Sequence, residues 1–393
     1  MTAKALAAAA LFAVPAACAQ PSTPPEGPVT PVGETPLDTG WKQVEITRGL
    51  IHPWSAAWLP DGKTILLTER EGRLRVFTDG AIRLDPVEGL PEISGIGQGG
   101  LMDVKLHPGF ERNRLVYFTA ATGTQSANRT CLFRGRLSED LTALTDVEEL
   151  YRVSRDKRGG QHFGSVLTWL SDGSLLMSIG DGGNPPVRLD DDFIRNNAQN
   201  PELAFGKTLR MTENGEPHPD NPFFDGDGDA PYVYTYGHRN VQGVAIRPGT
   251  QELWSTEHGA RGGDELNLLQ KGANYGWPKA TYSIEYWGPR ISESATLEGA
   301  LDPVAVWTPC IAPCGLTFYT GDAFPEWKGD LLAGGLVLKQ IRRVHFNDTG
   351  EIEGQTTLQF DDRIRWVGMG PDGGLYILTD VTDGGLYRIE PAS

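Results

Sequence analysis

Residues 369–380 read MGPDGGLYILTD, a Pro-Asp-Gly turn followed at once by a short apolar strand. Proline, aspartate and glycine favour the backbone angles of tight turns, and the apolar run that follows is typical of a strand. The same order of turn and strand occurs five more times: WLPDGKTILLTER at 58–70, LHPGFERNRLVYFT at 106–119, WLSDGSLLMSIGD at 169–181, IRPGTQELWSTEHG at 246–259 and FPEWKGDLLAGG at 324–335. Six copies of one unit predict a repeat architecture.

The spacing of these units indicates which repeat architecture to expect. Successive turns lie roughly 45 to 80 residues apart, and a period near fifty with several short strands per unit is typical of propeller blades. We therefore predict an all-β chain, a six-bladed β-propeller of four-stranded antiparallel blades. The late segment GGLYRIEP is expected to pair with the segment near Trp41 and close the ring. A pair of β-sandwiches is the alternative, but it leaves six similar turns unexplained.

Two segments precede the predicted propeller. Lys4, an apolar stretch and Ala-Cys-Ala at 17–19 together predict a signal peptide over residues 1–19. A lipoprotein signal with Cys18 as the acylated residue is the alternative, and both place the protein in the periplasm or outside the cell. Residues 20–38 are rich in Pro, Thr and Gly, which predicts a flexible leader, and residues 39–393 form the predicted catalytic propeller domain.

Charge and cysteine content exclude several functions. The chain has 35 basic and 51 acidic residues, a formal net charge of −16, which disfavours binding to nucleic acid or to anionic membranes. No apolar run long enough for a membrane span follows the first twenty residues. Cys310 and Cys314 are close enough in sequence to bridge in an oxidising compartment, and the sequence leaves open whether they do. Cys131 is expected to be a buried bystander.

Four loop segments combine polar residues with glycine beyond what turns alone require. They are GIGQGGLMDVKLHPGF with Gln98, GGQHFGSVLTW with His162, YGHRNVQGVAI with Arg239 and Asn240, and STEHGARGGDELNLLQKGANYGWP at 255–278. In this order, on a six-bladed pattern and with DRIRW at 362–366, they resemble the soluble PQQ-dependent glucose and aldose sugar dehydrogenases. The resemblance runs from about Trp41 to Pro391 and is closer to the aldose sugar dehydrogenase branch.

This resemblance implies a reaction and the residues that perform it. The implied reaction oxidises an aldose at C1 to the lactone, with hydride transfer to pyrroloquinoline quinone (PQQ) and His162 as general base. Arg239 would lie against the quinone carbonyl and stabilise the charge that develops there. Gln98, Gln161 and His162 are the implied substrate residues. Gln161 stands where the glucose enzymes have an acidic residue, which affects substrate preference and pH optimum.

PQQ is a planar tricarboxylate, so its site needs several cations in an otherwise acidic protein. Arg363 and Arg365 alternate along one predicted strand and can face the same carboxylates. Val337 occupies the position of a family lysine, and Lys339, two residues on, is expected to replace it. The implied cofactor-binding set is Gln98, Arg239, Asn240, Lys339, Arg363 and Arg365.

Calcium (Ca²⁺) is the second implied cofactor. Carbonyl oxygens of Gly259 and Ala260 are expected to bind the calcium that holds PQQ, and Glu265 with the carbonyl of Tyr275 a second, structural calcium. The run DGDGD at 225–229 lacks the acidic twelfth position of an EF-hand loop and is interpreted as a solvated loop.

Two other functions stay open on the sequence alone. A calcium-dependent sugar lactonase-type hydrolase, or a non-catalytic carbohydrate-binding propeller, would keep the blades. Neither has a reason to gather His162, Arg239 and the Arg363/Arg365 pair around one pocket. The expected partners are an aldose substrate and an electron acceptor that the sequence does not identify, and the oligomeric state is not determined.

Overall fold

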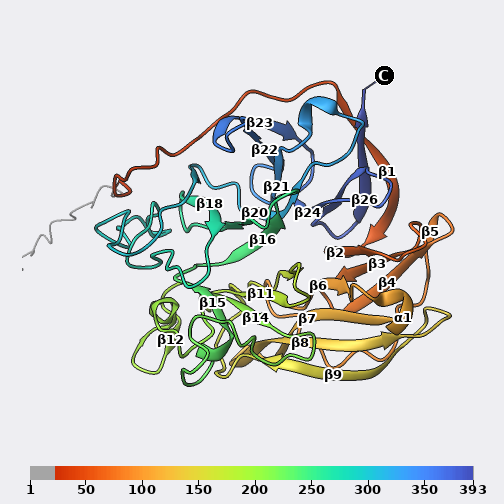
Figure 1. Cartoon of the computed structure of the whole chain (residues 1–393), viewed down its shortest axis with the longest axis horizontal. Coiled ribbons are helices and arrows are strands. Elements are labelled where there is room, and N and C mark those ends of the chain that lie inside the picture. The colour runs from red at the N-terminus through yellow and green to blue at the C-terminus, as the bar shows by residue number, and fades with distance from the viewer. Residues whose placement is uncertain (1–22, 393) are drawn as a thin grey trace, which may run out of the picture.

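The computed structural model describes residues 23–392, and nearly all of its regular structure is β-strand (Figure 1). Six sheets each contain four antiparallel strands, and β12 (Arg188–Leu189) with β13 (Asp192–Phe193) forms a separate small hairpin. The predicted six-bladed β-propeller of four-stranded antiparallel blades is therefore confirmed.

The blades follow one another in chain order, each with its first strand innermost. The first blade contains β2 (Pro53–Trp58), β3 (Ile65–Glu69), β4 (Arg73–Thr78) and β5 (Ala81–Ile82), and the second β6 (Leu101–Leu106), β7 (Leu115–Thr124), β8 (Ala127–Leu137) and β9 (Leu144–Arg152). The third contains β10 (Leu167–Trp169), β11 (Leu175–Ile179), β14 (Lys207–Met211) and β15 (Val233–Tyr236), and the fourth β16 (Val241–Ile246), β17 (Leu253–Glu257), β18 (Asp264–Leu269) and β19 (Ala305–Trp307). The fifth contains β20 (Pro313–Phe318), β21 (Leu331–Gly335), β22 (Gln340–Phe346) and β23 (Ile352–Gln359), and the sixth β24 (Ile364–Met369), β25 (Leu375–Thr379), β26 (Gly384–Pro391) and β1 (Trp41–Leu50).

Each of the six repeated turns joins the first and second strands of one blade. The second strands β3, β11, β17, β21 and β25 are buried along their whole length, whereas the third strand β4 is buried only in part and the outer strand β9 is mostly exposed or half-buried. A strand covered by neighbouring blades on both faces needs apolar residues at nearly every position. This burial explains why the apolar run after each turn was the clearest signal in the sequence.

The ring closes through strands from the two ends of the described chain. β1 forms the outer edge of the last blade and pairs antiparallel with β26, with Trp41 opposite Pro391 and Leu50 opposite Gly384. The innermost strands also contact one another around the ring, with β24 against β2. The predicted pairing of GGLYRIEP with the segment near Trp41 is confirmed.

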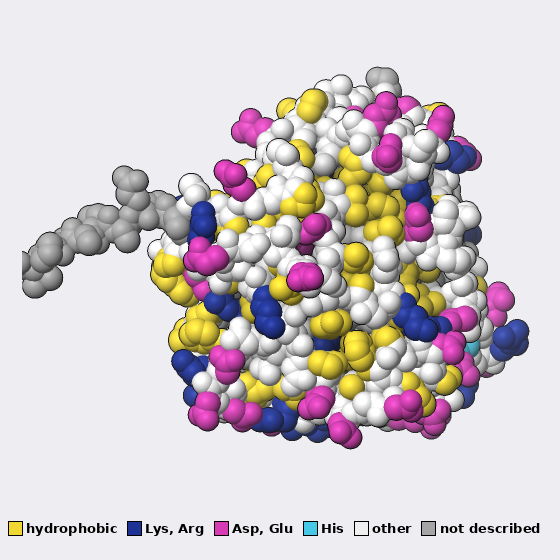
Figure 2. All heavy atoms as spheres, turned by 60° about the vertical axis from the view of Figure 1, so that its left-hand side comes forward, with side chains coloured by type: hydrophobic (Ala, Val, Ile, Leu, Met, Phe, Trp, Pro, Cys, Tyr) yellow, Lys and Arg dark blue, Asp and Glu magenta, His cyan; other side chains and the backbone are white. Residues whose placement is uncertain are grey.

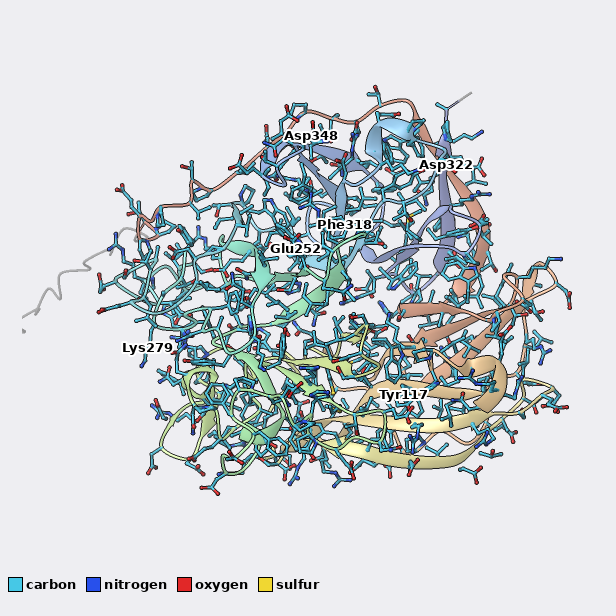
Figure 3. The ribbon with its side chains drawn as sticks, in the orientation of Figure 1. Tyr117, Glu252, Lys279, Phe318, Asp322 and Asp348 are labelled. Atoms are coloured by element: carbon cyan, nitrogen blue, oxygen red, sulfur yellow. The ribbon has the colours of Figure 1, made fainter. Side chains whose placement is uncertain are left out.

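The hydrophobic core lies between neighbouring blades. One cluster joins Leu66 of the first blade to Phe118 of the second. Tyr117 packs between the second and third blades, and Phe318 between the fourth and fifth (Figure 3). Each blade therefore buries its faces only because it has neighbours on both sides.

The described part of the Pro-rich leader, residues 23–38, runs as a strap along the outside of the propeller (Figure 1). Backbone bonds join Val32 to the fourth blade, and Asp38 accepts hydrogen bonds from Arg343 Nη1 (2.8 Å) and Thr356 Oγ1 (2.6 Å) of the fifth. These contacts hold the strap in place, whereas its composition indicated a flexible leader. Edge strands can accept such a segment without any apolar periodicity in it.

The remaining elements are short. They are the helix α1 (Phe110–Asn113) and the 3₁₀ turns η1 (Ile194–Gln199), η2 (Ala230–Tyr232) and η3 (Pro325–Trp327). None of the helices within residues 23–392 has the length and hydropathy that a membrane crossing requires. The predicted signal peptide and Cys18 lie outside the described residues.

The strap provides a test of this fold. Asp38→Ala removes a carboxylate that two partners on the fifth blade share, so we expect the free energy of unfolding in urea to fall by about 1–3 kcal/mol. Glu34→Ala, at an exposed position of the same strap, is the matched control and should change stability little. Equal stability of the two variants would contradict the anchoring role of Asp38.

Candidate active site

The predicted site residues share one place in the blade. Gln98, His162, Asn240 and Arg363 lie just before the innermost strands β6, β10, β16 and β24, respectively. The inner strand has the same position and direction in every blade, so these N-terminal ends meet at one end of the propeller axis. The second strand is antiparallel to the first, so the residues that follow it reach the same end.

His162 is buried and held from two sides. Its backbone N–H donates to Gln98 Oε1 (2.9 Å), and its Nδ1 lies 2.6 Å from Asp181 Oδ1. Asp181 Oδ2 also accepts a hydrogen bond from Trp277 Nε1 (2.8 Å), and Asp181 Oδ1 one from the backbone of Gly183 (3.0 Å). A carboxylate at Nδ1 places the ring proton there, which leaves Nε2 as the proton acceptor.

The environment keeps this imidazole neutral. Burial is the largest cause that lowers the pKa of His162 below its ordinary value, and the charge of Arg239 adds to it, while Asp181 opposes both. Lys157 is buried nearby, with Nζ 3.8 Å from the centre of the Phe163 ring, and burial lowers its pKa to about 7. No motif in the sequence indicated a role for Lys157. His162 is therefore able to accept a proton at neutral pH.

Glycines allow the chain to approach His162 closely. A Cβ at Gly180 would lie 2.3 Å from the carbonyl oxygen of His162, and one at Gly97 would lie 2.4 Å from that of Gly160. His162 itself has a left-handed φ of 50°, a conformation costly for a residue with a side chain. Gly97 and Gly180 therefore leave room for the backbone segments that carry Gln98 and His162 to pack against each other.

Arg239 lies close to His162 and comes just before β16 of the fourth blade. Its backbone N–H donates to Glu257 Oε2 (2.6 Å), its Nη1 to the carbonyl of His258 (2.9 Å) and its Nη2 to Asn184 Oδ1 (2.8 Å). The guanidinium carbon lies 5.5 Å from the centre of the Trp277 ring, the same ring that holds Asp181. Arg239 and the histidine–aspartate pair therefore share their supporting residues.

A second group of arginines comes from the first and last blades. Arg365 is buried, with Nη2 3.5 Å from Asp380 Oδ2, and the half-exposed Arg363 lies 3.4 Å from the same oxygen. Burial raises the pKa of Asp380. The charge of Arg365, with smaller contributions from His52 and Arg363, outweighs burial and lowers the pKa of Asp380 to about 2. The pocket beside them is lined by Trp54, Arg70, Gln98, Asn240, Gln242, His258, Arg363 and Arg365, among others.

His258 joins the two cationic groups. Burial lowers its pKa well below the ordinary value, and the charges of Arg239 and Arg365 lower it further. Its Nε2 lies 3.0 Å from the carbonyl of Pro313. His258 also lies in the lining of the pocket.

Trp54, Gln242 and Arg365 separate this pocket from the rest of the axis. The same three residues also line a second cavity of about 390 Å³ farther along the channel. Arg365 Nη1 donates to Gln242 Oε1 (3.2 Å), and its guanidinium carbon lies 5.6 Å from the centre of the Trp54 ring. These three side chains therefore form a wall that the two cavities share.

The segment predicted to bind calcium is tightly folded. Asp264 accepts backbone hydrogen bonds from Gly259 (2.7 Å) and from Ile311 and Ala312 (2.7 Å each). A Cβ at Gly259 would lie 2.3 Å from the carbonyl oxygen of Gly262, which only glycine avoids. The predicted carbonyls of Gly259 and Ala260 therefore belong to a rigid turn.

Glu265 faces Glu257 across paired strands, and Asn267 Nδ2 reaches both carboxylates, at 3.3 and 3.0 Å. Burial and then the charge of Glu257 raise the pKa of Glu265 well above its ordinary value. Tyr275 lies close by, stacked on His238. Within residues 23–392, no group of three or more His, Cys, Asp or Glu side chains is arranged to hold a metal ion, so a cation here needs backbone oxygens.

Three other groups of residues singled out in the sequence lie at or near the site. Lys339 is exposed and donates to the carbonyl of Asp361 (2.6 Å), and it is absent from the pocket lining. Gln161 lies at the mouth, where its Oε1 accepts the backbone N–H of Asn184 (3.1 Å). Cys310 and Cys314 are both free, and Cys314 Sγ lies against Arg365 and His258.

Fold and site together define a propeller protein with a charged axial pocket and a buried histidine–aspartate pair next to it. The Glucose / Sorbosone dehydrogenase family model matches residues 50–388, and the chain belongs to this family. Aldose sugar dehydrogenase YliI of Escherichia coli is 38% identical over 346 residues, 87% of this chain and 91% of that protein.

Two solved structures are similar to the whole propeller. The apo-form of the soluble aldose sugar dehydrogenase from Escherichia coli has a TM-score of 0.83 and 36% identity, covering 90% of this chain and 100% of that one. The PQQ-bound form of aldose sugar dehydrogenase from Streptomyces coelicolor has a TM-score of 0.72 and 27% identity, covering 89% and 97%.

The ionisation of His162 can be measured directly. We expect its imidazole to titrate below about pH 6.5, the ordinary histidine value, in NMR spectra of side-chain-labelled protein. Asp181→Asn removes the charge that opposes the shift, so the pKa of His162 should fall further. His107, which pairs with Glu213 on another blade, serves as the control, and its signals should not change between the two proteins. A higher pKa of His162 in the variant would contradict this account.

Proposed function

We propose that this protein is a PQQ-dependent sugar dehydrogenase that oxidises aldoses at C1 to the lactone. The observation that carries the proposal is a pocket lined by Arg70, Arg363 and Arg365, in a protein with a net charge of −16. His258 in its lining feels the charges of Arg239 and Arg365, and Arg239 also acts on the neutral imidazole of His162. Family membership and the PQQ-bound neighbour support the same activity.

The residues present suit a tricarboxylate. Arg70, Arg363 and Arg365 line one pocket and can each pair with a carboxylate of the cofactor. Among the atoms of the described residues, the buried Nε groups of Arg239 and Arg365 lack a hydrogen-bond partner. Buried donors are normally satisfied, so these two are available to an acceptor that the protein itself does not supply.

When bound, PQQ supplies the two-electron acceptor. His162 Nε2 takes the proton of the C1 hydroxyl, and Asp181 holds the ring in the tautomer that this step requires. Arg239 places positive charge where negative charge develops, supported by Asn184 and by the Trp277 ring. We assign to Gln98 and Gln161 the orientation of sugar hydroxyls, and to Asn240 contact with the cofactor.

We further propose that calcium binds to this chain at two places. The carbonyls of Gly259 and Ala260 would hold the ion beside PQQ, and Glu265 with the carbonyl of Tyr275 the second ion. The facing carboxylates of Glu257 and Glu265 support the second site, because a cation removes the cost of burying two like charges together. Lys339 is left out of the proposed cofactor site, because its ammonium donates to the backbone carbonyl of Asp361.

Export remains part of the proposal and rests on the first 19 residues alone. An exported dehydrogenase would pass its electrons to an acceptor outside the cytoplasm.

One assay tests the function. Purified protein is incubated with PQQ and calcium, an aldose is added, and bleaching of an artificial redox dye is followed. We expect dye reduction that depends on PQQ and on the sugar. Failure with every aldose would overturn the dehydrogenase; lactone hydrolysis would favour the lactonase-type hydrolase, and sugar binding without either reaction the carbohydrate-binding propeller.

The role of His162 has its own test. His162→Ala should keep its affinity for PQQ, measured by absorbance titration, and lose turnover by about 10²–10⁴-fold, the usual contribution of a general base. The matched control is His107→Ala, which removes a histidine from another blade and should retain full activity. Turnover within about threefold of the wild type in His162→Ala would rule out His162 as the base.

A further inference from the structure

A tight turn in the long loop between β18 and β19 carries two exposed aromatic side chains. The backbone N–H of Gly288 donates to the carbonyl of Glu285 (2.9 Å), and that of Glu285 to the carbonyl of Pro289 (2.8 Å). Tyr286 and Trp287 occupy the two central positions of the turn and are 54% and 60% exposed. They are the only two neighbouring aromatic residues among the exposed large hydrophobic residues of the described chain.

Contacts on one side place the turn at the mouth of the active site. Tyr286 Oη lies 3.5 Å from Nη2 of Arg239, the same nitrogen that donates to Asn184. Asn184 in turn donates its backbone N–H to Gln161. Tyr286 is therefore connected through Arg239 and Asn184 to Gln161, one of the proposed substrate residues.

Buried contacts on the other side fix the turn. Glu285 forms a buried ion pair with Arg195 (2.8 Å), and the Arg195 guanidinium lies over the Trp277 ring, 5.7 Å from its centre. Trp277 holds Asp181, the partner of His162. The turn that carries Tyr286 and Trp287 is therefore held by Arg195 and Trp277, and Trp277 also holds Asp181 beside His162.

We propose that Tyr286 and Trp287 form an accessory sugar subsite, which binds the second ring of a disaccharide whose reducing end lies at His162. This inference rests on the proposed function and names its substrate class: aldoses that carry a further sugar residue. Aromatic faces suit the apolar C–H faces of a neutral sugar, and exposed aromatic groups beside a polar pocket mark binding sites. Figure 2, which brings forward the side of the molecule at the left of Figure 1, shows exposed hydrophobic side chains there among charged ones.

The alternative occupant is a protein that accepts electrons at the mouth. The observations favour a sugar because the hydroxyl of Tyr286 contacts Arg239, so a ring lying on Tyr286 is continuous with the substrate pocket. A protein partner would need a broader surface than one turn.

The experiment compares glucose with cellobiose in wild-type, Trp287→Ala, Tyr286→Ala and Leu84→Ala proteins loaded with PQQ and calcium. We expect each aromatic variant to lower kcat/KM for cellobiose by about three- to tenfold, mainly through KM, and to change the value for glucose by less than about twofold. Leu84 is 93% exposed on the first blade and is the matched control, with both sugars unaffected. An unchanged cellobiose-to-glucose ratio in both aromatic variants would overturn the subsite.

A binding measurement separates this inference from the proposed function. Methyl cellobioside has no free C1 hydroxyl and cannot be oxidised, and saturation-transfer NMR reports its contact with the protein. Signals from its outer ring should be strong in the wild type and in Leu84→Ala, and weak in Trp287→Ala. No outer-ring signal in the wild type contradicts the subsite even where glucose is oxidised. A normal signal with no dye reduction by any aldose supports the subsite and contradicts the dehydrogenase.

An effect of the aromatic variants that appears only with a protein electron acceptor, at unchanged cellobiose KM, would assign the turn to partner docking and overturn the sugar subsite.

Discussion

The pairing of β1 with β26 is the constraint on which the rest of the structure depends. It completes the last blade with a strand from the other end of the described chain and brings β24 against β2, so that the ring is closed. Closure gives every blade two neighbours, and it brings the starts of the inner strands together at one end of the axis. Residues separated by more than two hundred positions, such as Gln98 and Arg363, line one pocket for this reason.

Electrostatics then determine what such a pocket can bind. The buried charges of the site have polar partners: Asp181 contacts His162, Arg365 pairs with Asp380, and the Arg239 guanidinium donates to the carbonyl of His258 and to Asn184. These pairs reduce the cost of burial, yet the arginine Nε donors remain unsatisfied within residues 23–392. A pocket of this kind favours a planar ligand with several negative charges, while the neutral imidazole beside it favours a neutral substrate that must lose a proton.

The sequence was sufficient for the fold because the second strands are buried on both faces, and burial leaves a continuous apolar run after each turn. It was also sufficient for residues in unusual glycine-rich settings, such as Gln98 and His162. The missed residues Arg70, Asp181, His258 and Asp380 all follow second strands, at or near the ends of the repeated segments. A comparison of those ends could have found them, since polar residues replace the apolar run there.

Other misses had no sequence signal. Lys157 is buried by contacts with Phe163 and a backbone carbonyl that only the folded loop creates. The strap at residues 23–38 is held by strand edges and by Arg343, so its own composition did not predict order. The expectation for Lys339 assumed a strand, but Val337 and Lys339 lie in the turn between β21 and β22, where Lys339 has a left-handed φ of 51°.

The central claim is that arginines from separate blades make a socket for a tricarboxylate quinone, and the affinity for PQQ tests it most directly. Absorbance titration would compare the wild type with Arg363→Gln/Arg365→Gln, with Arg136→Gln on the second blade as control and circular dichroism as a check on the fold. The account predicts affinity weakened by more than about tenfold in the double variant and unchanged in the control. Equal affinity in all three folded proteins would contradict it.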